Sequence, residues 1–181
     1  NGMSPSKRNN VYANSGIVVE INAEEDLYKF EKFGVLKGLE YQKSLERLAF
    51  TAGGRSQVAP AQRLTDFVEG NISVDLNPTS YQPGLKSSPL HSLLPKGIGS
   101  RLRGGFKAFG TKMKGYYTGE ANIVGVESRT SSPVNIPRTE KLEHPEIEGL
   151  FPCGEGGGYA GGIVSAAMDG ERCAEAAIVG L

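Results

Sequence analysis

Large apolar residues along the chain recur with a helical period in one central segment. Five of them are spaced by four, four, three and four positions: Ile98, Leu102, Phe106, Phe109 and Met113. This spacing places them on one face and predicts a core-facing helix over residues 97–113. A glycine pair at 104–105 lowers the helix propensity there and indicates close packing against another element.

Three more segments are predicted to be helical before that point. Residues 23–30 and 35–52 alternate apolar and charged side chains at helical spacing, and the second segment ends at a glycine pair, 53–54, which is a typical C-terminal stop. Pro60 suits the first turn of a helix that runs to Val68, with Gly70 beyond it. Prolines, serines and asparagines recur over residues 71–95, so we expect irregular structure there, and also in the polar opening, residues 1–15.

Short apolar and β-branched runs at residues 16–21, 121–128 and 150–153 predict strands, and residues 134–146 a connection. The last of these strands leads through glycines into a closing helix with a small, flat face suited to lying on a sheet. That face is formed by Ile163, Ala166, Ala167, Gly170, Ala174, Ala177 and Ile178. The chain offers too few strands to build such a sheet, so we expect its partner strands to come from elsewhere. The predicted fold class is α/β.

Composition narrows the class of protein. The chain has 181 residues, is 38% hydrophobic and carries 20 basic and 20 acidic side chains, so its formal net charge is zero. It is long enough to bury a core, and its charge balance argues against nucleic acid or an anionic membrane as the partner of the whole chain. No apolar run reaches the roughly 18 to 20 residues of a membrane span, and no signal segment opens the sequence; both favour the cytoplasm.

The two cysteines, Cys153 and Cys173, lack the spacing of a metal site, and no metal is expected. Their places on the predicted last strand and last helix favour buried free thiols. A redox role for Cys153, two residues before Glu155, is the alternative.

The densest signal is the glycine-rich run after residue 150. Gly156, Gly158 and Gly161 have the spacing G-x-G-x-x-G, in which glycines let backbone amides approach a phosphate at the start of a helix. A complete dinucleotide unit also needs a second parallel strand after that helix and an acid about 20 residues further on. The sequence supplies neither, so we expect this to be the last turn of a nucleotide-type sheet.

One acid, Glu155, lies in that run, just past the predicted strand. A carboxylate there can accept hydrogen bonds from ligand hydroxyls, such as those of a ribose or a sugar-alcohol chain. The amides of the first helical turn, at residues 161–163, are unpaired and carry the positive end of the helix dipole. The alternative, equally open from the spacing alone, is a glycine-rich bend with a surface acid.

The run resembles the C-terminal signature of a family of bacterial uncharacterised FAD-dependent dehydrogenases, which are relatives of flavoproteins with a glutathione-reductase-type FAD domain. The resemblance extends over essentially the whole chain. It is carried by residues 149–170 (GLFPCGEGGGYAGGIVSAAMDG), 58–64 (VAPAQRL), 112–116 (KMKGY), 126–134 (VESRTSSPV) and 1–4 (NGMS).

The resemblance implies an FAD-dependent oxidoreductase in which hydride passes between flavin N5 and an organic substrate or a reduced nicotinamide, NAD(P)H. Glu155 takes the place of the acid that binds the ribityl hydroxyls, and the amides of residues 159–163 would face the pyrimidine edge of the isoalloxazine. The polar turn at residues 129–131, directly after a strand, would face flavin or substrate. The implied cofactor-binding residues are Arg129, Thr130, Glu155, Gly156, Gly157, Gly158, Tyr159, Ala160, Gly161, Gly162 and Ile163.

The same resemblance implies a division of the chain. Residues 1–130 would form an inserted cap or substrate region, α+β in character, and residues 131–181 the C-terminal part of a Rossmann-like FAD-binding domain. The N-terminal strand, its phosphate-binding glycine turn and the ribose-binding acid have no counterpart in the sequence. We therefore expect FAD binding to require a missing N-terminal segment of the same parent protein. The substrate, an unknown small molecule, and the catalytic residues are not identified.

A second class of function is a non-catalytic binding or structural module. Residues 96–117 carry basic side chains without an acid, interleaved with aromatic residues, a mixture that can bind RNA or another polyanion. Because the aromatic residues fall on the apolar face of the predicted helix, we favour a solvated basic face; contact with a nicotinamide phosphate is a third possibility. His91 and His144 lie in predicted loops and are expected to be exposed, with neither acting as a base.

Overall fold

The computed structural model describes residues 7 and 9–179. The chain divides into two compact units. The first unit comprises residues 1–26 and 44–126, and the second comprises residues 27–43 and 127–181. The predicted opening loop lies in part outside the described residues, and the resembling segment 1–4 lies wholly outside them.

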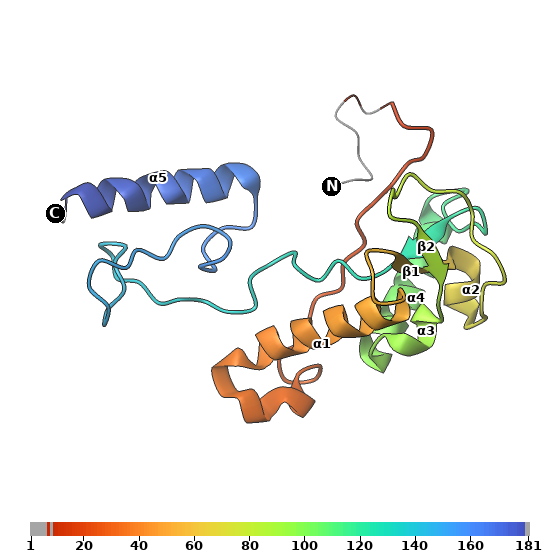
Figure 1. The fold of residues 1–181 in the computed structure, drawn as a ribbon, viewed down its shortest axis with the longest axis horizontal. Helices are drawn as coiled ribbons and strands as arrows, with labels where there is room; N and C mark the ends of the chain where they lie inside the picture. Colours follow the sequence, from red (N-terminus) through yellow and green to blue (C-terminus); the bar gives the residue numbers. More distant parts are fainter. Residues whose placement is uncertain (1–6, 8, 180–181) are drawn as a thin grey trace. The chain divides into compact units, whose positions relative to one another are not determined.

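A three-stranded sheet lies at the centre of the first unit (Figure 1). The middle strand is β1 (Ala59–Arg63), which pairs in parallel with β2 (Leu85–Ser87) and antiparallel with β3 (Asn122–Val124). Strand β3 confirms part of the strand predicted at residues 121–128. The predicted α/β character is thus confirmed as a mixed fold with a small sheet.

The helix predicted from Pro60 is wrong in its first half, because residues 59–63 form the central strand. A proline has no N–H to contribute to a sheet ladder and is tolerated mainly at strand ends and edges. Pro60 lies beyond Val124, the last residue of β3, which pairs with Ala61. Its carbonyl accepts a hydrogen bond from the Gly125 amide at 3.1 Å. The sheet therefore loses no ladder hydrogen bond within the β1–β3 pairing.

Helix α2 (Leu64–Glu69) follows β1 directly and ends at Gly70, whose φ of 83° confirms the predicted glycine stop. Helices α3 (Leu90–Leu93) and α4 (Lys96–Lys112) complete the first unit. Residues 71–95, predicted to be irregular, thus also contain β2 and α3.

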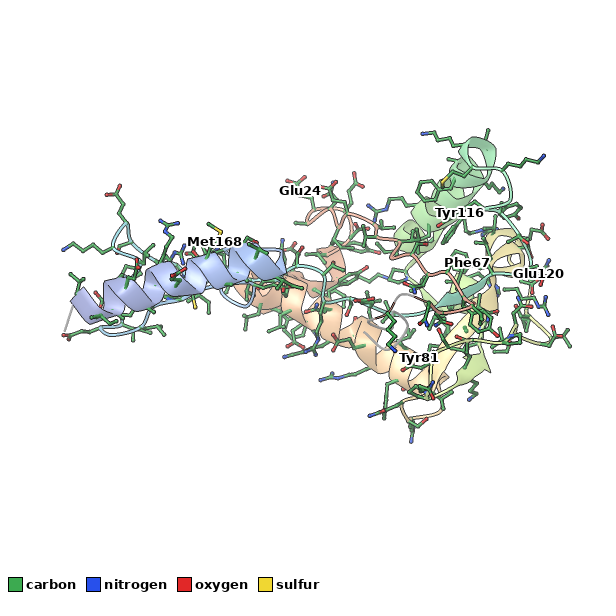
Figure 2. All side chains as sticks on the ribbon, turned by 90° about the horizontal axis from the view of Figure 1, so that it is seen from above. Glu24, Phe67, Tyr81, Tyr116, Glu120 and Met168 are labelled. Atoms are coloured by element: carbon green, nitrogen blue, oxygen red, sulfur yellow. The ribbon has the colours of Figure 1, made fainter. Side chains whose placement is uncertain are left out.

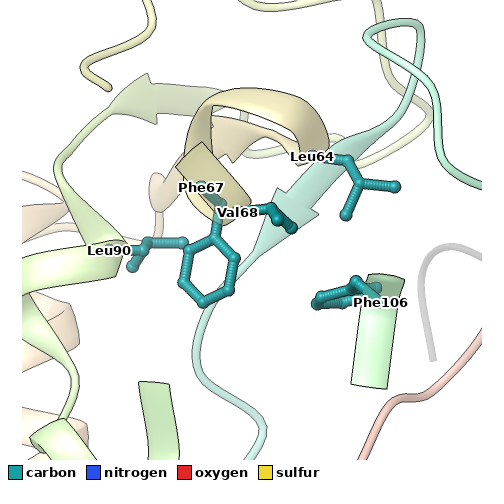
Figure 3. Close-up of a cluster of buried hydrophobic side chains, with 5 residues drawn as sticks. All are labelled: Leu64, Phe67, Val68, Leu90 and Phe106. Atoms are coloured by element: carbon teal, nitrogen blue, oxygen red, sulfur yellow. The ribbon is translucent and has the colours of Figure 1, made fainter. Parts of the chain in front are cut away.

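The core of the first unit gathers between these helices and the sheet (Figure 3). Its buried members are Leu64, Phe67, Val68, Leu90 and Phe106. The Phe67 and Phe106 rings meet edge to face, with centroids 6.1 Å apart. Phe106 comes from the apolar stripe that the sequence predicts, so the stripe of α4 does face the core.

Helix α4 agrees with the prediction to within one residue at each end. Its glycine pair does not pack closely, however. A Cβ atom at Gly104 or Gly105 would meet no other heavy atom within 4 Å, so both positions face open space. The predicted close approach there is wrong.

The second unit contains a 3₁₀ segment, η1 (Tyr28–Leu36), and the closing helix α5 (Ile163–Val179). Helix α1 (Lys37–Ala52) begins in the second unit and ends in the first. The α-helix predicted at residues 23–30 is wrong, because only a 3₁₀ segment from Tyr28 onward forms there, and Gly34, with a φ of 53°, interrupts it. The glycine stop predicted after Ala52 is confirmed by Gly54, with a φ of 96°.

Two predicted strands do not form in the structure. Residues 16–21 and 150–153 have no regular secondary structure, and neither segment has a ladder partner among the described residues. A strand exists only through pairing, so an isolated extended segment is not one. The carbonyl of Pro152 instead accepts hydrogen bonds from the side chain of Arg138, at 2.9 Å, and from Cys173.

Helix α5 buries a different face from the predicted one. Asp169 and Cys173 are buried, whereas Ile163 and Ile178 of the predicted face are 92% and 73% exposed. Met168, which is labelled on α5 in Figure 2, is also exposed. Some alanines of the predicted face are thus half-buried, and the others are exposed. Within the described residues, no helix is long and apolar enough to cross a bilayer.

Candidate functional site

The glycine-rich run folds into a compact loop, residues 154–159, which we call the glycine loop. Within it, the Gly158 amide donates to the Glu155 carbonyl and the Tyr159 amide donates to the Gly154 carbonyl, each at 3.0 Å. Gly154 and Gly158 have φ values of 65° and 85°, a left-handed conformation that glycine adopts with little strain. Glu155 therefore lies in a tight turn closed by two backbone hydrogen bonds.

The Glu155 carboxylate is exposed. It forms no hydrogen bond or ion pair with any residue in the described part of the chain, unlike Glu143, whose carboxylate accepts the Gly149 amide at 2.7 Å. A carboxylate with free lone pairs on a structured loop can accept hydrogen bonds from the hydroxyls of a ligand.

The glycines of the loop and of the segment that follows it fall into two groups. A Cβ atom at Gly158 would lie 2.8 Å from the Val134 carbonyl oxygen, and one at Gly157 would lie 3.0 Å from the Cys153 carbonyl oxygen. These two glycines therefore let the chain pack against its own backbone. Gly156 and Gly161 face open space instead, where a substituent would meet nothing within 4 Å. The bend interpretation thus explains Gly157 and Gly158, but not the other two.

The amides predicted to face a ligand, at residues 159–163, are only partly free. The Tyr159 amide is used inside the glycine loop, and the Gly162 amide donates to the Ser165 hydroxyl at 3.2 Å. The amides of Ala160, Gly161 and Ile163 have no acceptor among the described residues. They precede or open α5, where the helix dipole favours negative charge.

Arg138 and Asp169 form an ion pair that contacts the glycine loop. The sequence patterns do not predict this pair. Arg138 Nη2 donates to Asp169 Oδ1 at 2.7 Å and Nη1 donates to Oδ2 at 2.9 Å, a bidentate arrangement. Asp169 Oδ2 also accepts the Gly154 amide at 2.9 Å. We call these two residues the Arg138–Asp169 clasp. It holds the peptide groups on both sides of Cys153, because Arg138 Nη1 also donates to the Pro152 carbonyl.

The clasp reaches the far end of the glycine loop through Tyr159. The Arg138 guanidinium lies over the Tyr159 ring, 3.6 Å from its centroid. The Tyr159 hydroxyl donates to the Ile136 carbonyl at 2.8 Å, which fixes the ring from its other end. Arginine suits this position because its planar guanidinium can stack and form a bidentate pair at once.

Electrostatics keep the clasp ionised. The hydrogen bond from Arg138, followed by the one from the Gly154 amide, lowers the pKa of Asp169 from 3.8 to about 2. The same hydrogen bond raises the pKa of Arg138 above its ordinary value. Both side chains are only about one-tenth exposed, at 10% and 9%. Hydrogen bonds offset the cost of burying such a pair, and here they extend beyond the pair to the Pro152 carbonyl and the Gly154 amide.

Arg129 and Thr130, the other predicted site residues, are exposed in the same unit as the glycine loop. The structure brings their segment to the loop through Ser132, whose hydroxyl lies 2.7 Å from the Val134 carbonyl and 3.3 Å from the Gly156 carbonyl. Ser132 was not singled out from the sequence.

The cysteines differ from each other. Cys173 is buried and free, as predicted, and burial raises the pKa of its thiol. Cys153 is free but exposed, so its predicted burial is wrong. The reason is that residues 150–153 form no strand in a covered sheet.

The basic stretch of the first unit is largely a solvated face with internal contacts. Arg101 forms an ion pair with Asp26 at 2.6 Å, and Arg103 Nε donates to the Val68 carbonyl at 2.7 Å. The remaining lysines of the stretch are exposed. Two of its cations are therefore committed to the fold itself.

Neither histidine is fully exposed, contrary to expectation. His91 is half-buried and its Nδ1 lies 2.9 Å from Nε2 of the buried Gln62. His144 Nδ1 accepts the amides of Glu146 and Ile147, each at 3.1 Å. Both imidazoles therefore have structural hydrogen bonds within the described part of the protein.

Comparisons with known proteins place the chain in a family. A family model described as "FAD-dependent protein, C-terminal domain-like" matches residues 1–130. An uncharacterised protein of Clostridium beijerinckii is 40% identical over 177 residues, which cover 97% of this chain and 32% of the relative. The chain thus spans about a third of the length of this curated relative. The chain belongs to the family of FAD-dependent proteins with this C-terminal domain.

Proposed function

We propose that this chain is the C-terminal portion of an FAD-dependent oxidoreductase and that the glycine loop binds the ribityl chain and isoalloxazine of the flavin. The observation that carries the proposal is the exposed, unpaired carboxylate of Glu155 on a loop closed by its own hydrogen bonds, in a chain of an FAD-dependent family. The residues present fit the cofactor, since an acceptor for hydroxyls and free amides lie within nine residues of each other.

Each residue has a distinct part in this proposal. Glu155 would accept hydrogen bonds from the ribityl hydroxyls, and the amides of Ala160, Gly161 and Ile163 would donate toward the ring. Gly156 and Gly161 leave open space in which a ligand can approach the backbone. Bound FAD would supply hydride transfer, while the protein sets access and orientation. Arg129 and Thr130 would lie on the flavin or substrate side.

The proposal also assigns a role to each of the two parts of the chain. Residues 1–130 would form the cap or substrate region, and residues 131–181 would form the C-terminal part of the FAD-binding domain. The adenosine and pyrophosphate sites would lie in the remainder of the parent protein, and the electrons would come from NAD(P)H or from an organic substrate. The threefold greater length of the relative supports a larger parent.

The test compares Glu155→Ala and Glu171→Ala in the full parent protein. Glu171 is a second exposed acid, on α5, and is the matched control. A hydrogen bond to a charged group contributes about 1.5–3 kcal/mol, so we expect Glu155→Ala to weaken FAD binding about 10- to 100-fold and Glu171→Ala to leave it unchanged. FAD dissociation constants from fluorescence titration give both values. Equal affinities in the two variants would refute the role of Glu155.

A non-catalytic module remains the second candidate because Gly157 and Gly158 pack on the chain's own backbone. In this view the glycine loop is only a bend. The two proposals differ in the absorbance of the purified parent protein. A flavin spectrum supports the oxidoreductase, whereas a colourless parent that also fails to take up added FAD supports the module.

A further inference from the structure

Both ends of the glycine loop contact the Arg138–Asp169 clasp. At the first end, the Gly154 amide is bound to Asp169, which is paired with Arg138. At the other end, the Tyr159 ring stacks on Arg138. Both ends of the loop, already joined by the Tyr159–Gly154 hydrogen bond, are therefore held against one ion pair from outside the loop.

The loop itself is poorly suited to holding a fixed shape. Four of its six residues are glycines, and glycine has the largest backbone entropy of any residue. Two internal hydrogen bonds close the turn, and the carbonyls of residues 156–158 accept hydrogen bonds from Ser132, Asn135 and the Ile136 amide, but Glu155 itself is exposed. Without an external restraint, a ligand would have to order this loop on binding and would bind more weakly.

We propose that Arg138 and Asp169 are positioning residues for the Glu155 carboxylate, and that the clasp pre-organises the glycine loop for its ligand. The inference rests on the proposed function, in which Glu155 binds the flavin's ribityl hydroxyls. Neither clasp residue touches the cofactor in this scheme. They act through Gly154 and Tyr159, which bracket Glu155 in the sequence.

The clasp is built for this role rather than for burial alone. Arg138 Nη1 has three acceptors, among them the Cys173 sulfur at 3.2 Å, and Asp169 Oδ2 is shared between Arg138 and the Gly154 amide. A pair that only neutralised two charges would not need contacts with both ends of a loop. Lysine cannot reproduce the arrangement, because it lacks the bidentate fork and the stacking plane.

The test is a double-mutant cycle in the full parent protein, with FAD affinity as the readout. Asp169→Asn keeps a side-chain oxygen that can accept the Gly154 amide but removes the charge from the pair. Tyr159→Leu removes the stack without leaving a buried charge unpaired, so it serves as the second variant if Asp169→Asn folds poorly. Each is made alone and combined with Glu155→Ala. Asp75→Asn, which breaks an ion pair with Arg63 in the first unit, is the matched control.

If the clasp acts through Glu155, each clasp variant should weaken FAD binding about tenfold in the parent background and have little effect when Glu155 is already alanine. Coupling of this kind is what a cycle detects, and a general loss of structure would lower affinity equally in both backgrounds. Equal losses in the two backgrounds, or no loss in either, overturn the inference. If Glu155→Ala alone leaves affinity unchanged, the proposed function fails instead.

Discussion

The Arg138–Asp169 clasp should make the second unit lose stability in acid, and Asp169→Asn should abolish this dependence. The pKa of Asp169 is lowered from 3.8 to about 2 by Arg138 first and by the Gly154 amide second. A carboxyl group with a lowered pKa in the folded state stabilises the fold above its unfolded-state pKa, and this contribution disappears as the pH falls through the folded-state value. The sensitive window therefore runs from about pH 4 down to about pH 2.

The magnitude follows from the same two values. A difference of one pKa unit corresponds to about 1.4 kcal/mol, so a fall from 3.8 to about 2 represents about 2 kcal/mol of stabilisation at neutral pH. The side chains are 10% and 9% exposed, so solvent screening reduces this value little. In terms of an opening equilibrium, about 2 kcal/mol is a change of about 30-fold.

Hydrogen exchange of the α5 amides, followed by mass spectrometry, measures this opening locally. We expect protection in the native protein to fall about 30-fold between pH 6 and pH 2, after correction for the intrinsic exchange rate. Asp169→Asn should be less protected at pH 6 and should show no such fall. If both proteins lose the same protection between these pH values, the ion pair does not stabilise the second unit and the reasoning is wrong.

Three further outcomes test the described packing. Phe67→Ala should lower the free energy of unfolding by about 3–5 kcal/mol, measured by urea denaturation, because the ring is fully buried; a loss below about 1 kcal/mol would contradict the core. Gly158→Ala should lower the melting temperature more than Gly156→Ala, since only Gly158 combines a φ of 85° with a carbonyl oxygen 2.8 Å from the added Cβ; equal shifts would count against this geometry. Cys153 should react with a thiol reagent in the native protein and Cys173 only in denaturant, because only Cys153 is exposed; equal rates would refute the burial of Cys173.

Helix α4 could be predicted from the sequence because its core contacts come from residues spaced along one face. Ile98 and Phe106 are buried, and the spacing alone identifies them. The glycine stops after α1 and α2 were equally predictable, because they depend on local backbone geometry. Strand β1 was not, since its sequence APAQR lacks β-branched residues and its strand conformation comes from neighbours on both sides.

The candidate site was predicted in part. Glu155 and the glycines are contiguous, so a local pattern reveals them. The clasp joins residues 31 positions apart, and no local pattern predicts it, because Asp169 lies outside the face of α5 that was predicted to be covered. A buried carboxylate needs a partner, and Arg138 lies in the segment assigned merely as a connection. Recognising Arg138 as that partner required the three-dimensional structure.

The local character of the clasp has a consequence for folding. Its hydrogen bonds join residues 14 to 35 positions apart, whereas the first unit contains contacts such as Ser15 with Tyr116, 101 positions apart. Short chain separations carry a smaller loop-closure penalty and favour rapid assembly. The turn that bears Glu155 should accordingly take shape early during folding, before the long-range contacts of the small sheet are complete.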